Sequence, residues 1–154
     1  MYRIERARPE QIHSIAVLFA LDMSGLGHDA NPESYLPMLR EALAAQGEGS
    51  HLWVAVPETG GQPVGVLFAE EIWSLKVAGK ALWIEELFVH PEHRRGGLGR
   101  QLVESLLDWA ERAPEILGVE LEAYQMNTAA SILYRSLDFR RLARERYCFY
   151  FHEQ

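Results

Sequence analysis

The residues of this chain that are best suited to chemistry lie between Glu85 and Arg100, in the stretch EELFVHPEHRRGGLGR. The stretch begins at the end of the apolar run of residues 81–89, which predicts a strand, and continues through a short turn that contains Pro91. A basic, glycine-rich loop follows and leads into a helix. Glycines let a backbone approach a ligand closely, and the first N–H groups of a helix have no partners within the helix. Because a helix N-terminus also carries a partial positive charge, this order of elements suits the binding of a phosphate group.

Two common phosphate-binding motifs do not match this loop. A Walker loop ends in Gly-Lys-Ser/Thr, whereas residues 97–101 read GLGRQ. The dinucleotide fingerprint Gly-x-Gly-x-x-Gly does not occur, and no strand near the N-terminus leads into the loop. Taken alone, the loop is also consistent with an ordinary strand-to-helix turn that is tight because of its glycines.

Two adjacent acids, Glu85 and Glu86, lie inside the apolar run of residues 81–89. Successive strand residues face opposite sides of a sheet, so two neighbouring carboxylates cannot both reach solvent easily when the strand is covered on both faces. An unpaired buried carboxylate is unfavourable and its pKa rises. Either this strand is an edge strand or at least one acid lines a wet site, and the composition of the strand favours the site.

Two blocks of sequence resemble one family. Residues 94–99, RRGGLG, resemble the Arg/Gln-x-x-Gly-x-Gly/Ala signature of the GNAT superfamily of acetyl-CoA-dependent N-acetyltransferases. Residues 121–139 resemble the family's Asn-x-x-Ala-x-x-x-Tyr-x-x-x-Gly-Phe stretch, with Asn127, Ala130 and Tyr134 in matching places. Asp138 departs from the pattern, because the family usually has Gly there. Two blocks in the expected order make the resemblance specific.

The resemblance implies an α/β fold with a central, mostly antiparallel mixed sheet, a splayed parallel pair of strands and helices on both faces. It also implies acetyl-CoA as cosubstrate. The pyrophosphate would bind to the glycine loop, and the pantetheine arm would pair with the strand before the loop like an added strand. The residues expected to bind the cosubstrate are Leu87, Phe88, Val89, Arg94, Arg95, Gly96, Gly97, Leu98, Gly99, Arg100 and Asn127. Asn127 is also a good helix cap, and the Val89 N–H is the expected oxyanion donor.

Acetyl transfer to an amine has three chemical requirements. An amine with a pKa of roughly 10.4 must lose a proton, the oxyanion needs N–H donors, and a departing thiolate with a pKa of roughly 8.5 needs a proton. The resemblance implies that Tyr134 donates to the thiolate, although its place on an apolar helix stripe also fits a packed core residue. Glu85 is the candidate for taking the amine proton, through a water molecule. Glu86 is the alternative base or an anchor for the substrate ammonium. The purely structural alternative for Glu85 and Glu86 is a salt-bridged pair at a distortion of the strand.

Length and charge bound the class of protein. The chain has 154 residues, and we expect one domain over residues 1–154. A formal net charge of −7 argues against a nucleic-acid partner and is compatible with a cationic acceptor. The charged N-terminus and the lack of a long apolar run predict a cytoplasmic protein without a membrane partner. The histidines are scattered, so we expect no metal site. Cys148 is expected to be a buried, small apolar residue. The sequence is also compatible with a homodimer.

The hydrophobic pattern predicts elements in the order that the resemblance requires. Strands are expected at Tyr2–Ala7, His51–Val56, Pro63–Glu71, Ala81–Val89, Val119–Tyr124 and Arg144–Phe151. Helices are expected from Pro9 to about Leu21, from Pro32 to before Gly47, from Leu98 to before Pro114, and from the cap at Asn127 to Leu137. The segment from Asp22 to Asn31 reads as a loop. A helix between two strands implies that these strands pair in parallel.

These observations favour an N-acetyltransferase that moves an acetyl group from acetyl-CoA to a primary amine by direct attack in a ternary complex. A small cationic amine is the favoured acceptor, and a protein N-terminus or lysine is the alternative. Two other classes stay open. One is a GNAT-like module that binds CoA without catalysis, and the other is a nucleotide-binding domain that uses the loop for ATP or NAD.

Overall fold

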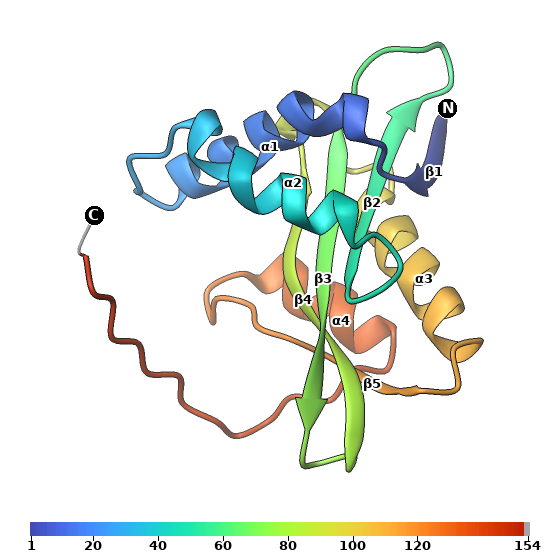
Figure 1. The fold of residues 1–154 in the computed structure, drawn as a ribbon, viewed down its shortest axis with the longest axis vertical. Helices are drawn as coiled ribbons and strands as arrows, with labels where there is room; N and C mark the ends of the chain where they lie inside the picture. Colours follow the sequence, from blue (N-terminus) through green and yellow to red (C-terminus); the bar gives the residue numbers. More distant parts are fainter. Residues whose placement is uncertain (153–154) are drawn as a thin grey trace. The chain divides into compact units, whose positions relative to one another are not determined.

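The computed structural model describes residues 1–152 of the chain, which divide into two compact units. The first unit comprises residues 1–121 and the second begins at Glu122. The first unit is built on a five-stranded sheet (Figure 1). Its strands are β1 (Tyr2–Arg6), β2 (Ser50–Pro57), β3 (Gly65–Ser74), β4 (Gly79–Val89) and β5 (Ile116–Leu121).

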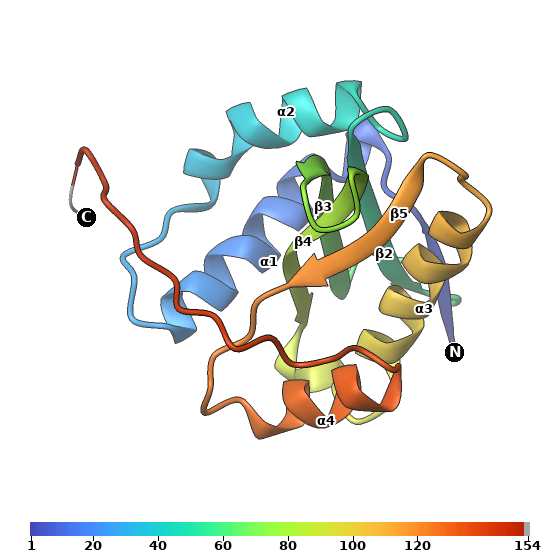
Figure 2. The same cartoon turned by 90° about the horizontal axis from the view of Figure 1, so that it is seen from below.

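The sheet has the order β1-β2-β3-β4-β5, antiparallel throughout except for the parallel pair β4–β5. Helices α1 (Ile12–Gly25) and α2 (Leu36–Ala44) cover one face, and α3 (Leu98–Glu111) covers the other (Figure 2). This arrangement confirms the predicted mixed, mostly antiparallel sheet with helices on both faces. The parallel pairing ends at Ile84 opposite Leu121, whereas β4 continues to Val89, so the two strands part toward the loop.

Each face of the sheet carries its own buried layer. Under α1 and α2, the ring of Phe19 stacks on Phe68 with 6.1 Å between centroids. Under α3, the periodic side chains Leu98, Leu102 and Leu106 are almost completely buried. This spacing of four residues places them on one helix face, as the sequence predicts. Burial of both faces makes the sheet a rigid support for the residues at its edges.

Two predicted boundaries differ from the structure in ways that matter for the site. Helix α1 continues to Gly25, so Asp22 belongs to the helix and not to the predicted loop. Strand β5 begins at Ile116 and ends at Leu121, three residues earlier than predicted at either end. The helix continues because residues 21–24 contain no Gly or Pro that would end it.

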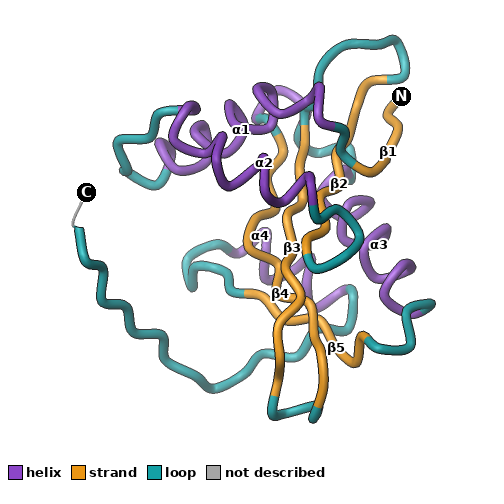
Figure 3. The backbone as a smooth tube through the Cα atoms, in the orientation of Figure 1, coloured by secondary structure: helices purple, strands orange, loops and turns teal. Residues whose placement is uncertain are grey.

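The second unit contains helix α4 (Thr128–Ser136), and no strand occurs in its described part, residues 122–152. The prediction of a strand at Arg144–Phe151 is therefore wrong, and Figure 3 shows this segment as loop. Cys148 is exposed rather than buried. Aromatic residues favour strands only where a neighbouring strand offers hydrogen bonds and a surface to pack on, and the local sequence does not specify such a neighbour.

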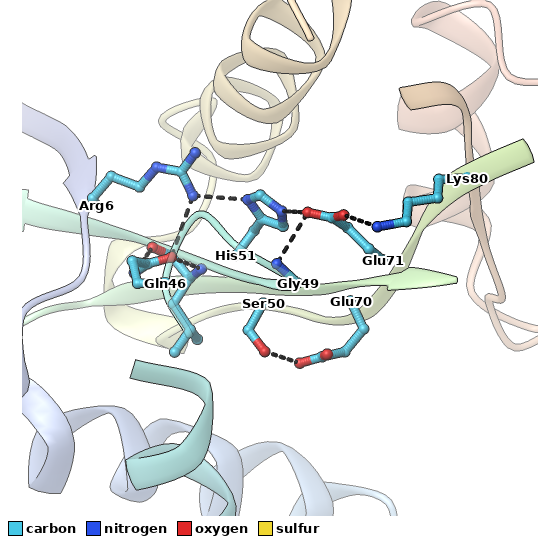
Figure 4. A network of polar contacts seen from close by, with 9 residues as sticks. Arg6, Gln46, Gly49, Ser50, His51, Glu70, Glu71 and Lys80 are labelled. Atoms are coloured by element: carbon cyan, nitrogen blue, oxygen red, sulfur yellow. Dashed lines mark hydrogen bonds and ion pairs between the residues drawn. The ribbon is translucent and has the colours of Figure 1, made fainter. Parts of the chain in front are cut away.

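A polar network around the buried His51, which the sequence did not reveal, joins four strands on the α3 side (Figure 4). His51 on β2 is completely buried, and its Nδ1 lies 3.0 Å from an Arg6 guanidinium nitrogen. Its Nε2 lies 2.8 Å from Oε2 of Glu71, whose other oxygen is 3.5 Å from Lys80 Nζ. The Trp109 ring of α3 packs over His51 at 4.3 Å between centroids.

These contacts fix the protonation state of His51. Arginine can only donate, so Nδ1 must accept from Arg6, and Nε2–H must donate to Glu71. The imidazole is therefore neutral in the folded chain. Burial, together with the charge of Arg6, lowers the pKa of His51 even though the Glu71 contact raises it. A second proton would place an N–H against the Arg6 guanidinium.

We expect this network to weaken in acid. Below the ordinary His pKa of 6.5 the unfolded chain takes up a proton at residue 51 that the folded chain does not, so the free energy of unfolding falls as pH drops through this value. His51→Gln, whose amide can accept and donate in the same places, should lose less stability between pH 7 and pH 5. Denaturant titrations at both pH values measure the difference, with His13→Gln at an exposed position as control. Equal losses in wild type and His51→Gln would contradict the assignment.

Candidate functional site

The glycine loop between β4 and α3 has the backbone of an anion-binding turn. After the short 3₁₀ turn Pro91–His93, Arg95 and Gly97 adopt left-handed φ values of +70° and +77°. Gly97 is the N-cap of α3, and it supplies no side chain to bond the first N–H groups of the helix. Apart from the adjoining residues, no heavy atom lies within 4 Å of the place where a Cβ on Gly96 or Gly97 would sit. The loop therefore offers free N–H donors and open space to a phosphate.

The three arginines of this region are held in different ways. Arg94 folds back, so that its Nε donates to the carbonyl of Val89 at 2.8 Å and its guanidinium lies 5.3 Å from the Phe88 ring centroid. Arg100 pairs with Glu104 one turn along α3, at 2.9 Å. Arg95 is exposed beside the loop. A guanidinium has five N–H donors, so the two contacts of Arg94 leave some of its donors for an anion.

A residue that sequence reasoning passed over anchors the start of this loop. The Tyr2 hydroxyl on β1 lies 2.8 Å from Nδ1 of His93, and the two rings meet edge to face at 5.8 Å between centroids. His93 comes directly before Arg94. The contact joins residues 91 positions apart, so no local pattern in the sequence could indicate it. It ties the loop to the first strand of the sheet.

A β-bulge separates the two acids of β4. Ala69 on β3 lies opposite Ile84, and the next β3 residue, Phe68, lies opposite Glu86. Glu85 is therefore the extra residue of the bulge, and its exposed carboxylate accepts a hydrogen bond from Trp83 Nε1 at 2.9 Å. Because opposite residues share a face, Glu86 lies on the Phe68 face, under α1. Bulges often re-aim side chains beside active sites.

Glu86 is the most perturbed acid of the site. One carboxyl oxygen accepts the N–H of Leu87 at 3.0 Å. Burial, a hydrogen bond with Asp22 of α1 and the negative charges of Asp22 and Glu85 raise the pKa of Glu86 to about 9, against the opposing effect of the Leu87 N–H. At neutral pH the Glu86 carboxyl therefore holds a proton.

Tyr35 completes this group, which we call the acceptor cluster: Asp22, Tyr35 and Glu86. The Tyr35 ring packs edge to face on Phe19 at 5.7 Å between centroids. Burial and the charges of Glu86 and Asp22 raise the pKa of Tyr35. The sequence indicated Glu86 and placed Asp22 in a loop, but it could not bring the two acids together, because they lie 64 positions apart, on β4 and α1. Only the position of α1 over the sheet brings the two acids together.

The second unit holds the two other predicted residues. Asn127 is the N-cap of α4, and its Oδ1 accepts the N–H of Ala130 at 3.0 Å, as the helix-cap interpretation predicts. The Tyr134 ring packs edge to face on Phe139 at 5.6 Å between centroids. Asp138, which stands where the resembling family has Gly, adopts φ +67°. A left-handed backbone at this position explains why the family usually has Gly. In this chain Asp138 adopts the same conformation, and Asp is one of the residues that tolerate it.

Within residues 1–152, no group of three or more His, Cys, Asp and Glu side chains is placed to hold a metal ion. Among the same residues, no helix has the length and apolar character required to span a bilayer.

Comparison with known proteins identifies the class. Residues 12–139 match the model of the acetyltransferase (GNAT) family, and the chain belongs to that family. A curated relative, N-acetyltransferase 8 of Homo sapiens, is 32% identical over 100 residues, which are 65% of this chain and 43% of that protein. The chain thus spans less than half of the length of this relative.

Solved structures share the fold. A possible acetyltransferase from Clostridium difficile 630 superposes with a TM-score of 0.82 at 20% identity, over 99% of both chains. AAC(6')-Iy, solved with the bisubstrate analogue CoA-S-monomethyl-acetylneamine, superposes with a TM-score of 0.76 at 18% identity, over 100% of this chain and 99% of that one. The family match extends over both structural units, and we keep a single functional domain over residues 1–154 as a proposal.

We expect the substitution Gly97→Asp to lower CoA affinity by about 100-fold or more, equivalent to roughly 2.8 kcal/mol. It places a Cβ and a like charge where the phosphate should lie, on a backbone with φ +77°. Titration calorimetry with CoA measures the effect. Gly60→Asp, at φ +98° in the turn between β2 and β3, imposes similar backbone strain away from the loop and should bind CoA like the wild type. If Gly97→Asp bound CoA with wild-type affinity, the assignment of the phosphate site to this loop would be wrong.

Proposed function

We propose that the chain transfers the acetyl group of acetyl-CoA to a primary amine, with a small cationic amine as the favoured acceptor. The observation that carries the proposal is the acceptor cluster around Glu86, which lies on the strand that leads into the glycine loop. One strand thus connects a group of acids that suits an ammonium to a set of N–H donors that suits a phosphate. Family membership supports acetyl transfer as the reaction.

The loop residues fit the cosubstrate. The uncapped first turn of α3 and the open space above Gly96 and Gly97 would receive the pyrophosphate, with Arg95 and Arg100 at its sides. The edge of β4 from Glu86 to Val89, beyond the end of its pairing with β5, would receive the pantetheine arm by strand-like hydrogen bonds. Acetyl-CoA supplies an acetyl group activated as a thioester.

Glu86 takes the role of base in this proposal. In the ternary complex the amine nitrogen attacks the carbonyl carbon, its proton passes to the deprotonated Glu86 carboxylate, and the C–S bond breaks. A base with a pKa of about 9 is matched to an amine with a pKa of roughly 10.4. We prefer Glu86 to Glu85 because Glu85 is exposed and already accepts from Trp83. We assign to Tyr134 the donation of a proton to the departing thiolate, on the match of its motif alone.

The acceptor cluster favours a cation as acceptor. Two carboxyl groups and a phenol oxygen offer only a small number of protons and several lone pairs, which suits an ammonium with three donors. AAC(6')-Iy, which shares the fold and was solved with an acetylneamine bisubstrate analogue, supports a small polyamine-like molecule as the acceptor. A lysine or N-terminal amine of a protein also carries one ammonium, so such acceptors are the second candidate.

A screen for thiol release tests the proposal. We expect acetyl-CoA consumption that depends on an amine, fastest with small polycations such as spermidine, slower with lysine-containing peptides and absent with acidic amino acids. The KM of the best amine should rise between ionic strengths of about 0.01 M and 0.15 M, because the Debye length shrinks from roughly 30 Å to 8 Å. Tight CoA binding without release by any amine would favour the non-catalytic module instead. ATP or NAD binding in place of CoA would favour the nucleotide-binding class.

The pH dependence distinguishes the two acids. Below a pKa of about 9 Glu86 is protonated and cannot accept the amine proton, so kcat/KM should rise with pH toward this value. Glu86→Gln should lower kcat by about 100-fold or more, in the range of general-base catalysis, and should lose this limb of the profile. Glu85→Gln should keep the limb and most of the rate. The reverse pattern would assign the base to Glu85.

A further inference from the structure

The turn Pro91–His93, which precedes the glycine loop, is held at both ends by distant parts of the first unit. At its start, the His90 N–H donates to the carbonyl of Val64, directly before β3, at 2.8 Å. At its end, Nδ1 of His93 lies 2.8 Å from the Tyr2 hydroxyl of β1. Across the turn, the His93 N–H donates to the His90 carbonyl at 2.8 Å. These contacts fix the position of the turn relative to the sheet.

The residues after the turn have a backbone that needs such support. Arg95 adopts φ +70°, which is uncommon for a residue other than glycine, and Gly97 follows at +77°. Strained backbone persists only where the surrounding structure determines it. Residues 94–97 are exposed, so packing against the core contributes little to their position. The loop therefore depends on the groups at its ends, which are His93 before it and the buried Leu98 after it.

The contact between Tyr2 and His93 has two separable parts. The two half-buried rings meet edge to face at 5.8 Å between centroids, and the hydroxyl is hydrogen-bonded to the imidazole. A phenyl ring at position 2 would keep the packing and lose only the hydrogen bond. The role of the hydroxyl can therefore be measured without opening a gap between the strand and the turn.

We propose that Tyr2 is a positioning residue for the cosubstrate, which acts through His93 to hold the glycine loop in the conformation that receives the pyrophosphate. This inference rests on the proposed function, because it takes the loop as the binding site of CoA. Tyr2 acts without contacting the acetyl group or the acceptor, and its hydroxyl stays on His93 throughout.

The positioning role couples the first strand to the cosubstrate. Strand β1 is the outermost strand of the sheet and pairs with β2 (Figure 1). When β1 separates from β2, the Tyr2–His93 contact is lost and the loop loses one of its supports. Coupling between two binding events is reciprocal. Bound CoA therefore makes the separation of β1 less favourable by the same factor by which docked β1 strengthens CoA binding.

The first test is Tyr2→Phe. Loss of one hydrogen bond should raise the Kd for CoA, measured by titration calorimetry, by about 3- to 10-fold. The KM for acetyl-CoA should rise by a similar factor, whereas kcat at saturating acetyl-CoA should stay unchanged. The control is Arg3→Gln, which removes a hydrogen bond to Glu5 on the opposite face of the same strand and should bind CoA like the wild type. Equal Kd values for the wild type and Tyr2→Phe would overturn the proposal.

Substitutions of the partner test the route. His93→Ala should weaken CoA binding at least as much as Tyr2→Phe, and His93→Asn, whose amide oxygen can take the place of Nδ1, should restore part of the loss. The double variant of Tyr2→Phe and His93→Ala should bind CoA like His93→Ala alone, because both changes remove one contact. Losses that add in the double variant would show that the two residues act separately, which contradicts the proposal.

Hydrogen exchange measures the coupling in the reverse direction. CoA should slow the exchange of the amides of residues 2–6 in the wild type, and this slowing should be about 3- to 10-fold smaller in Tyr2→Phe. The same slowing in both proteins would contradict the coupling.

The positioning role and the proposed function fail in different ways. If no amine is acetylated, the proposed function fails, and CoA binding still measures the role of Tyr2. If amines are acetylated and the wild type and Tyr2→Phe bind CoA equally, the proposed function stands and the positioning role fails. If the wild type does not bind CoA, both fail.

Discussion

The pairing of β3 with β4 across a one-residue bulge is the constraint on which the site depends. Without the extra residue, Ile84 and Glu86 would lie on the same face of the sheet, because they are two positions apart. With it, Ile84 is opposite Ala69 and Glu86 is opposite Phe68, on the face that α1 covers. Ile84 and Glu86 of the same strand therefore lie on opposite faces of the sheet. The strand can stay paired with β3 and still present a carboxyl group to α1.

Two parts of the proposed cosubstrate site depend on backbone shape more than on side chains. The left-handed conformation at Gly97 starts α3 without a side-chain cap, and the early end of the β4–β5 pairing leaves an open edge. Both features are properties of the backbone, and many different side chains nearby are compatible with them. This is consistent with a fold that is shared at about 20% identity. Asp138 makes the same point in the second unit, since its φ of +67° keeps a turn that glycine usually makes.

The sequence predicts the sheet, the helices and the glycine loop because hydrophobic period, glycine and proline are local signals. It does not predict the meeting of Asp22 with Glu86 or of Arg6 with His51, because each pair is joined only by the tertiary packing of distant elements. It also places a strand at Arg144–Phe151 that the structure lacks. There the local preference is real, but a strand is completed by a neighbour, and residue composition says nothing about whether one is present.

The hydrogen bond between Tyr2 and His93 has a consequence for how sequence variation in this family member should be interpreted. By position, Tyr2 belongs to the outermost strand of the sheet and would be classed as scaffold in a saturation mutagenesis map. By contact, it holds the residue next to Arg94 in the loop. Its phenotype should therefore group with loop substitutions, as a change in ligand affinity at nearly constant protein abundance. Distance along the chain is a poor guide to which of its positions share a phenotype.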